Sequence, residues 1–245
     1  MQRFIIFIIF LLAITLGVYL ASFSNTNNDI DGVKKAIKNA YPDITVDNIR
    51  VFNDKFFEVT VQKEIFYITK DYENLIAGNI IELKTGENLT EKTKQNERVS
   101  LINNLDTNGM IIYKPKKTNH VLTVFTDTSC PYCKKLHDEI DNLITNNIEV
   151  RYVLFSRNGN NDDAFRQMVS IWCSGDRLKN LDMAFDGDFI ENDNSCENPI
   201  SKNYTSAQNL GVTGTPMIFT GDGKLIVGYQ PSRAIIAYLE KLSSN

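Results

Sequence analysis

The hydrophobic pattern of the chain begins with an apolar run. From Phe4 to Ala21 almost every residue is apolar, and no polar face marks the run as a surface helix of a globular protein. Its length lies between that of a signal-peptide core and that of a minimal membrane-spanning helix. Small residues at 22–24 favour cleavage, so residues 1–24 are predicted to be a signal peptide, with an uncleaved membrane anchor as the alternative. Either alternative predicts an exported protein.

Residues 25–88 have the pattern of a small α+β domain. Apolar residues between Ile30 and Tyr41 recur at helical spacing, and Pro42 ends the predicted helix. Apolar residues that alternate with polar ones at 57–61, and apolar runs at 65–68 and 80–83, then predict three strands. A domain of this size is marginally stable alone, so we expect it to gain stability by pairing with a second copy.

Residues 89–109 are markedly polar, and their charged half lacks the apolar stripe of a packed helix. We therefore predict an exposed helical linker between two domains. The alternative is an ordinary surface helix within one continuous domain.

Residues 110–245 alternate between strand and helix patterns. The predicted elements are a strand at 121–125, a helix at 130–146, a strand at 148–155, two or three short helices within 164–210, a hairpin at 217–229 and a helix at 231–242. The first three elements form a β-α-β unit, which predicts a parallel crossover and a sheet covered by helices.

Two cysteines, Cys130 and Cys133, lie where the strand 121–125 gives way to the next helix. A thiol at a helix N-terminus meets unpaired N–H groups and the positive end of the helix dipole, which favour the thiolate. A lowered pKa makes a cysteine both a nucleophile and a good leaving group in disulfide exchange. The same spacing occurs in zinc sites, but no second CxxC or HxxxH spacing follows. We predict redox chemistry and no metal.

The two thiols are predicted to have different roles. Cys130 precedes the helix and is expected to be the exposed, attacking thiol, whereas Cys133 lies one turn in and is expected to be more buried and to resolve the mixed disulfide. Between them, Pro131 removes one backbone donor and Tyr132 adds bulk beside the sulfur.

Two basic residues in the first turns of this helix, Lys134 and His137, are candidates for adding positive potential near the thiolate. The alternative for each is a solvated side chain without a role in the chemistry, and we favour it for Lys134.

Gly214-Thr215-Pro216 precedes the first strand of the predicted hairpin. A proline at the start of a central strand is unusual unless its missing N–H leaves room for another chain. A cis Pro216 would place the Thr215 backbone beside Cys130, where it can pair with an extended substrate. The alternative is an ordinary trans proline that marks the start of the strand.

The remaining cysteines, Cys173 and Cys196, form the second possible pair. In an oxidising compartment paired cysteines persist as disulfides. We expect this bond to be structural and to stabilise the fold by about 3 kcal/mol through loop closure.

Composition narrows the classes of partner. The chain is 42% hydrophobic and 23% charged, as in globular proteins, with a formal net charge of -4. Lys and Arg are scattered, which argues against nucleic acid as a partner. The chain has two histidines, so a histidine-based metal centre is not expected. No cofactor is expected beyond a redox-active Cys130–Cys133 disulfide.

The stretch Val124–His137 closely resembles the active-site segment of the DsbC/DsbG family of periplasmic disulfide isomerases. Further similar segments are Trp172-Cys173, Asp176-Arg177, Cys196, Gly211–Pro216 and Gly228–Pro231. The similarity is specific from about Met110 onwards, and before that point it is one of layout only.

This resemblance implies an α+β protein with a cystatin-like N-terminal dimerisation domain, a helical linker and a C-terminal thioredoxin-fold domain with a helical insertion. It also implies a periplasmic homodimer, a cis Pro216, a structural Cys173–Cys196 disulfide and reduction by a membrane thiol reductase of the DsbD type. Pro131 stands where the DsbC branch typically has Gly, whereas Thr215 resembles DsbC. The motif therefore leaves the redox poise open.

The expected function is thiol–disulfide exchange that isomerises wrong disulfides in misfolded secreted proteins through a mixed disulfide at Cys130. One alternative, from another class, is a holdase-type chaperone that binds unfolded chains in a dimer cleft. The other is a net thiol oxidant or a DsbG-like sulfenic acid reductase.

Overall fold

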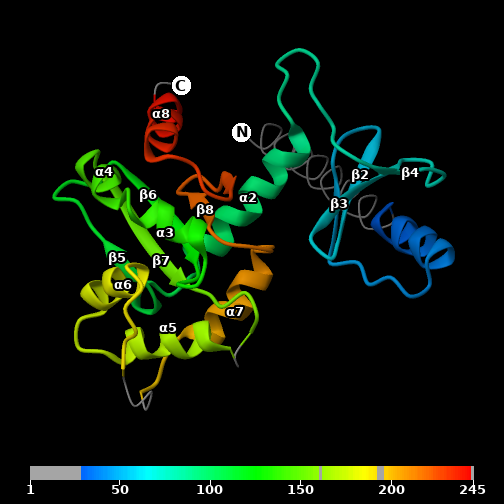
Figure 1. Ribbon diagram of the computed structural model, residues 1–245. Helices are drawn as coiled ribbons and strands as arrows, with labels where there is room; N and C mark the ends of the chain where they lie inside the picture. Colours follow the sequence, from blue (N-terminus) through cyan, green and yellow to red (C-terminus); the bar gives the residue numbers. More distant parts are fainter. Residues whose placement is uncertain (1–28, 160–161, 192–195, 244–245) are drawn as a thin grey trace, which may run out of the picture. The chain divides into compact units, whose positions relative to one another are not determined.

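The computed structural model describes residues 29–159, 162–191 and 196–243. The chain divides into two compact units, Met1–Thr90 and Glu91–Asn245 (Figure 1). The apolar run and the possible cleavage region lie outside the described residues. Within the described ranges, no helix is both long and apolar enough to cross a membrane.

The N-terminal unit combines a helix, described over 29–40, with a four-stranded antiparallel sheet. In sheet order its strands are β1 (Asn48–Val51), β2 (Phe56–Val61), β3 (Glu64–Thr69) and β4 (Leu75–Ala77). The core of the unit contains Val33, Ile37, Phe57, Val59 and Ile68. The apolar stripe of the helix is thus buried together with β2 and β3. The predicted helix and the strands at 57–61 and 65–68 are confirmed.

The prediction of a strand at 80–83 is wrong. These residues make only an isolated bridge, between Ile81 and Asn88, and the last strand of the sheet is β4 instead. Ile81 and Leu83 are 47% and 98% exposed. Residues 80–82 exchange backbone hydrogen bonds with the short segment 87–89, but most of their side chains stay exposed, so the apolar run is not stabilised as a full strand.

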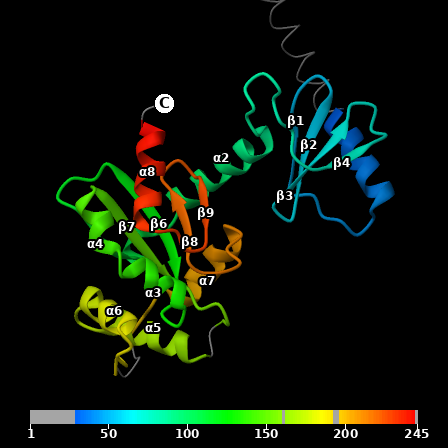
Figure 2. The same cartoon turned by 45° about the horizontal axis from the view of Figure 1, so that its top comes forward.

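The C-terminal unit is built on a mixed five-stranded sheet (Figure 2). In sheet order its strands are β5 (Ile111–Tyr113), β7 (Ile148–Leu154), β6 (His120–Thr126), β8 (Met217–Thr220) and β9 (Leu225–Val227). Strands β6 and β7 are parallel, with Thr126 opposite Leu154, and the other neighbours are antiparallel. The predicted crossover and the predicted hairpin are confirmed.

Helices pack on both faces of this sheet. They are η1 (Thr107–Gly109), α3 (Pro131–His137), α4 (Ile140–Thr145), α5 (Asp163–Cys173), α6 (Arg177–Phe185), α7 (Ile200–Asn209) and α8 (Ser232–Ser243). Leu122 and Val124 belong to the larger core, with α3 to α6 and α8. Phe125 belongs to a second core, with Ala207 of α7. Successive side chains of β6 therefore point alternately into the larger and the second core. The end of the strand, and the cysteine motif after it, lie between these two packed layers.

The helix predicted at 130–146 is in fact two helices that break at Glu139. This residue has φ -107° and ψ 12°, and its carboxylate accepts a hydrogen bond from the Ser232 backbone N–H at 2.8 Å. The Ser232 and Tyr229 hydroxyls donate to the same carboxylate, and these bonds lower the pKa of Glu139. Tertiary bonds to the start of α8 thus override the local helical pattern.

The polar segment after residue 88 is helical as predicted, over α2 (Leu89–Asn103), but its predicted exposure is only partly right. Gln95 Nε2 donates to the Asp222 carbonyl at 2.7 Å, and Arg98 Nε donates to the Gly223 carbonyl at 2.8 Å. Gly223 has φ +81°, and a Cβ there would lie 2.4 Å from the Gln95 carbonyl oxygen. A glycine therefore allows α2 to pack on the β8–β9 turn.

Candidate active site

The two cysteines of the CPYC motif lie at the N-terminus of α3, directly after β6. Cys130 is the N-cap residue, in extended conformation, and its N–H donates to the Asp127 carbonyl at 3.0 Å. Its own carbonyl accepts from the Cys133 and Lys134 N–H groups at 3.0 and 3.1 Å, which starts the helix. Both cysteines are free thiols in the structure.

The Thr215–Pro216 segment lies against the first of these thiols. The Cys130 thiol donates to the Thr215 carbonyl at 3.3 Å, and the Thr215–Pro216 peptide bond is cis. Cys130 is only 3% exposed, so the prediction of an exposed thiol is wrong. The prediction assumed an open helix end. In the fold, the Thr215 main chain contacts the Cys130 sulfur and covers it.

The pKa values of the two thiols are shifted in opposite directions. Burial raises the pKa of Cys130, but hydrogen bonding from the Thr215 side chain and from the Cys133 and Tyr132 amides outweighs it, so the net pKa is lowered. Burial also raises the pKa of Cys133, here to about 12, in spite of hydrogen bonding from Thr126 and from the Asp127 amide. The geometry therefore provides one nucleophilic thiol and one that keeps its proton.

Two buried hydroxyls belong to this arrangement. Thr126 Oγ1 and Thr215 Oγ1 have no conventional hydrogen-bond partner within the described part of the chain. Each nevertheless lowers the pKa of a thiol, Thr126 that of Cys133 and Thr215 those of both cysteines. A hydroxyl is a hydrogen-bond donor, so each favours the thiolate form of its cysteine over the neutral thiol.

The structure adds two site residues for which no role was predicted. They are Asp127 and Arg157. Asp127 is fully buried, and its carboxylate lies 3.0 Å from Arg157 Nε. Arg157 follows β7, so the parallel pairing of β6 with β7 brings it to the cysteine motif. An acidic residue at the end of an apolar strand was the available sequence signal, whereas its partner depends on the tertiary fold.

The two basic residues of α3 point to other groups. Lys134 Nζ pairs with Asp138 at 2.8 Å and with Asp186 at 3.3 Å, and the hydrogen bond to Asp138 raises its pKa. His137 is buried, and its Nε2 lies 3.0 Å from Asp182. Burial lowers the pKa of His137 against the opposing effect of Asp182, so the imidazole is held neutral.

His137 is also packed among aromatic rings. Its ring stacks on Phe185 at a centroid distance of 4.5 Å, and its Nδ1 lies 3.4 Å from the Tyr152 hydroxyl. These contacts make it part of the core beneath α3 and α6. They do not place a positive charge beside Cys130.

Pro131 and Tyr132 occupy the outer side of the motif. Both are exposed, and Tyr132 is 56% exposed with Lys135 Nζ 5.4 Å from its ring centroid. Pro131 is the first helical residue, where a missing N–H costs no helix hydrogen bond. An exposed aromatic ring thus lies next in sequence to a buried thiol.

The second cysteine pair lies in a separate region. Cys173, the last residue of α5, is bonded to Cys196 across 23 residues of sequence. Arg177 caps the same helix end, because its Nε donates to the Trp172 carbonyl at 2.8 Å and its guanidinium lies 3.7 Å from the Trp172 ring centroid.

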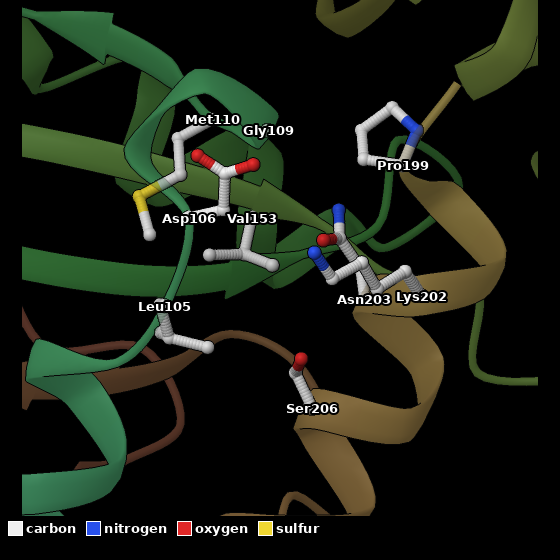
Figure 3. A pocket seen from close by; sticks show the side chains of 9 residues that line it. All are labelled: Leu105, Asp106, Gly109, Met110, Val153, Pro199, Lys202, Asn203 and Ser206. Atoms are coloured by element: carbon white, nitrogen blue, oxygen red, sulfur yellow. The ribbon is translucent and has the colours of Figure 1, made fainter. Parts of the chain in front are cut away.

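No candidate metal centre involves the cysteine motif in the described ranges. No group of three or more His, Cys, Asp or Glu residues there is arranged to hold a metal ion. A hollow of about 30 Å³, with room for roughly one water, lies between the η1 region and α7 (Figure 3). Its lining includes Asp106, Val153 and Asn203, and none of the site residues.

Comparisons with known proteins agree with this geometry. Residues 107–243 match the thioredoxin-like domain family, and residues 23–91 match the N-terminal domain of disulfide bond isomerase proteins. Thiol:disulfide interchange protein DsbC of Dickeya dadantii is 37% identical over 184 residues, which cover 74% of this chain and 75% of the relative. DsbC of Escherichia coli K12 is 34% identical over 185 residues, 75% of this chain and 76% of the relative.

A solved structure extends the comparison to the fold. The crystal structure of a disulfide interchange protein from Neisseria gonorrhoeae superposes with a TM-score of 0.50 at 25% identity, over 56% of this chain and 97% of that one. With its α+β architecture, its two matched domains and these relatives, the chain belongs to the DsbC/DsbG-type family of thioredoxin-like thiol:disulfide interchange proteins.

Proposed function

We propose that this protein isomerises disulfides in other proteins through a mixed disulfide at Cys130. The observation that supports this most strongly is the position of Cys130 at the N-terminus of α3 against the cis Thr215–Pro216 segment, with its pKa lowered and that of Cys133 raised to about 12. A stabilised thiolate attacks readily, whereas a partner that retains its proton resolves slowly. The mixed disulfide therefore lasts long enough for a substrate thiol to act.

The steps balance without an added redox agent. The Cys130 thiolate attacks one sulfur of a substrate disulfide, forms the mixed disulfide and releases the second substrate sulfur as a thiolate. A different substrate thiolate then attacks the substrate sulfur of the mixed disulfide, which forms a new substrate disulfide and returns the Cys130 thiolate. Attack by Cys133 instead reduces the substrate and leaves a Cys130–Cys133 disulfide.

Substrate binding follows from the same geometry. The Thr215 carbonyl that contacts Cys130 is a main-chain acceptor next to the sulfur, so an extended substrate backbone can pair with this segment. Pro131 and Tyr132 line the exposed side and contact the apolar part of the chain. Lys134 and His137 have modulating roles at most, through Asp186 and Asp182.

The cellular setting is part of the same proposal. Residues 1–24 direct export to the periplasm as a signal peptide or an uncleaved anchor, and residues 25–88 pair two chains into a homodimer. Residues 89–109 link them to the catalytic domain at 110–245. A membrane thiol reductase of the DsbD type returns any Cys130–Cys133 disulfide to the reduced form, and no cofactor other than this cysteine pair is needed.

Refolding of a scrambled multi-disulfide protein tests the proposal. Cys130→Ser is expected to abolish isomerisation, whereas Cys133→Ser is expected to retain part of it, because a substrate thiol can release the mixed disulfide. Cys173→Ala/Cys196→Ala is the matched control and should keep the exchange rate. Full activity of Cys130→Ser would exclude this mechanism.

A holdase is the second candidate function. An apolar groove of about 220 Å³ in the N-terminal unit, lined by residues such as Tyr41, Val61 and Leu75, favours binding of unfolded chain. The variant Cys130→Ser/Cys133→Ser separates the two functions. A chaperone would still suppress aggregation of a reduced, unfolded client, whereas an isomerase without chaperone activity would not.

A further inference from the structure

A buried carboxylate lies in the turn that carries the attacking thiol. Asp127 accepts four hydrogen bonds, two from the Ser129 N–H and hydroxyl at 2.8 and 2.7 Å and two from the Arg157 N–H and Nε at 3.2 and 3.0 Å. All four partners act as donors, which is the environment of an ionised carboxylate. Its side chain is 0% exposed, so its charge requires compensation.

The main chain of Asp127 contacts both cysteines. Its carbonyl accepts the Cys130 N–H at 3.0 Å, and its N–H acts on the Cys133 sulfur. The Asp127 carboxylate therefore fixes a turn whose two ends hold the two thiols. A change in this side chain is transmitted to the Cys130 turn through the hydrogen bond between the Asp127 carbonyl and the Cys130 N–H.

Arg157 completes the arrangement from the end of the neighbouring strand. Besides the two bonds to Asp127, its Nη2 donates to the Ser129 hydroxyl at 3.1 Å. Its side chain is 38% exposed, so one side of the guanidinium faces solvent. Burial lowers the pKa of Arg157, but the hydrogen bond and the charge of Asp127 outweigh it, so the pKa is raised and the guanidinium stays charged one residue away from Cys130 through its bond to Ser129.

We propose that Asp127 and Arg157 are a positioning pair for the exchange reaction, in which Asp127 holds the Cys130 turn and Arg157 supplies the positive charge that offsets this carboxylate and stabilises the Cys130 thiolate. The proposal deepens the proposed function and rests on Cys130 as its nucleophile. It gives Arg157, which lies outside the CPYC motif, the role for which Lys134 and His137 were candidates, namely positive potential near the thiolate.

Among the residues that the structure describes, the other groups near Cys130 do not replace this cation. From α3, Cys133 is neutral at ordinary pH, Lys134 is paired with two carboxylates, and Lys135 lies over the Tyr132 ring. From the loop before β8, Thr215 contributes an uncharged hydroxyl and carbonyl.

Single substitutions of Arg157 and Asp127 are predicted to shift the Cys130 pKa in opposite directions. Arg157→Met leaves the buried carboxylate uncompensated beside the thiolate, so the Cys130 pKa should rise. Asp127→Asn keeps an acceptor for Ser129 and leaves the cation unopposed, so the Cys130 pKa should fall. A purely structural role predicts a different outcome, because loosening the turn from either side would shift the pKa in the same direction.

The experiment is a titration of the reduced full-length protein, followed by ultraviolet absorbance of the thiolate and by alkylation rate. At a pH below the Cys130 pKa, Arg157→Met should slow alkylation about threefold to tenfold and Asp127→Asn should accelerate it by a similar factor, with both effects reduced by high salt. The double variant should return close to the parent rate. Arg151→Met, which removes a β7 arginine paired with Glu149, is the matched control and should have no effect.

Arg157→Lys keeps the proposal testable if Arg157→Met fails to fold, because it preserves the charge and should preserve most of the thiolate. Shifts in the same direction for Arg157→Met and Asp127→Asn, or no shift in either, would overturn the proposal. The titration uses no protein substrate. A failed refolding assay with intact opposite shifts would therefore count against the isomerase function and leave the positioning pair standing.

Discussion

The two cysteine pairs of this protein lie in contrasting regions. Cys130 and Cys133 lie at the start of a helix, among donors that act on sulfur, and remain free thiols. Cys173 lies at the end of a helix and is bonded to Cys196, which is exposed. The N-terminal end of a helix favours a thiolate, and the C-terminal end does not.

The contrast shows that surroundings rather than residue type decide the role of a cysteine. At the first pair, a neighbouring chain segment contacts the attacking sulfur, and burial keeps the second thiol protonated. At the second pair, the bond closes a loop between two helical segments, where it restrains the unfolded chain. We therefore expect chemistry to depend on the first region and stability on the second.

The largest predicted effect is on the relative reactivity of Cys130 and Cys133. A thiol with a pKa of about 12 is ionised to roughly one part in 10⁵ at pH 7, whereas an ordinary thiol is ionised to a few per cent. Alkylation of the reduced protein at pH 7 should thus favour Cys130 by at least about a thousandfold, as measured by peptide mass spectrometry. The Cys133 rate should rise about tenfold per pH unit towards pH 12, while the Cys130 rate levels off earlier. Equal alkylation rates of Cys130 and Cys133 at pH 7 would contradict the predicted difference in pKa between the two thiols.

The second prediction concerns stability. Removing the Cys173–Cys196 bond in Cys173→Ala/Cys196→Ala should lower the free energy of unfolding by about 3 kcal/mol, the loop-closure value for 23 residues. Denaturant unfolding measures this, and the alkylation rate of Cys130 should stay within about twofold of the parent because the regions are separate. A large loss of thiol reactivity would show that the second pair also shapes the active site.

The prediction with the smallest expected effect concerns the C-terminal end of α5, which carries Cys173. Arg177→Ala removes the hydrogen bond to the Trp172 carbonyl and the contact with its ring, and should cost about 1 kcal/mol of unfolding free energy. Thermal or denaturant unfolding measures the loss. Thiolate titration of the same variant should match the parent, in contrast to Arg157→Met, and a shifted Cys130 pKa would contradict the separation of the two regions.

Sequence patterns predicted most of the fold because local periodicity and burial agree in most elements. The crossover from β6 to β7 and the last helix followed from apolar spacing alone. The two failures occurred where tertiary contacts decide the structure. Residues 80–83 pair only with the short segment 87–89 and leave most of their side chains exposed, and the predicted helix at 130–146 breaks where Ser232 binds the Glu139 carboxylate.

The same distinction applies to the site. The CPYC motif and Thr215-Pro216 are visible in sequence because chemistry requires those residue types at those positions. The burial of Cys130 and the bond between Asp127 and Arg157 were not predictable, because each depends on segments that only the folded sheet brings together. Long-range contacts of this kind leave no periodic signal in a single chain.

The most direct test of the account is to locate the mixed disulfide. Cys133→Ser protein is incubated with a substrate that contains disulfides, quenched with acid and mapped by mass spectrometry, with Cys130→Ser as the matched variant. We predict that substrate is linked to Cys130 in the first variant and that the second forms almost no adduct. Rapid capture of substrate by Cys133 in Cys130→Ser would contradict the assignment of the attacking thiol.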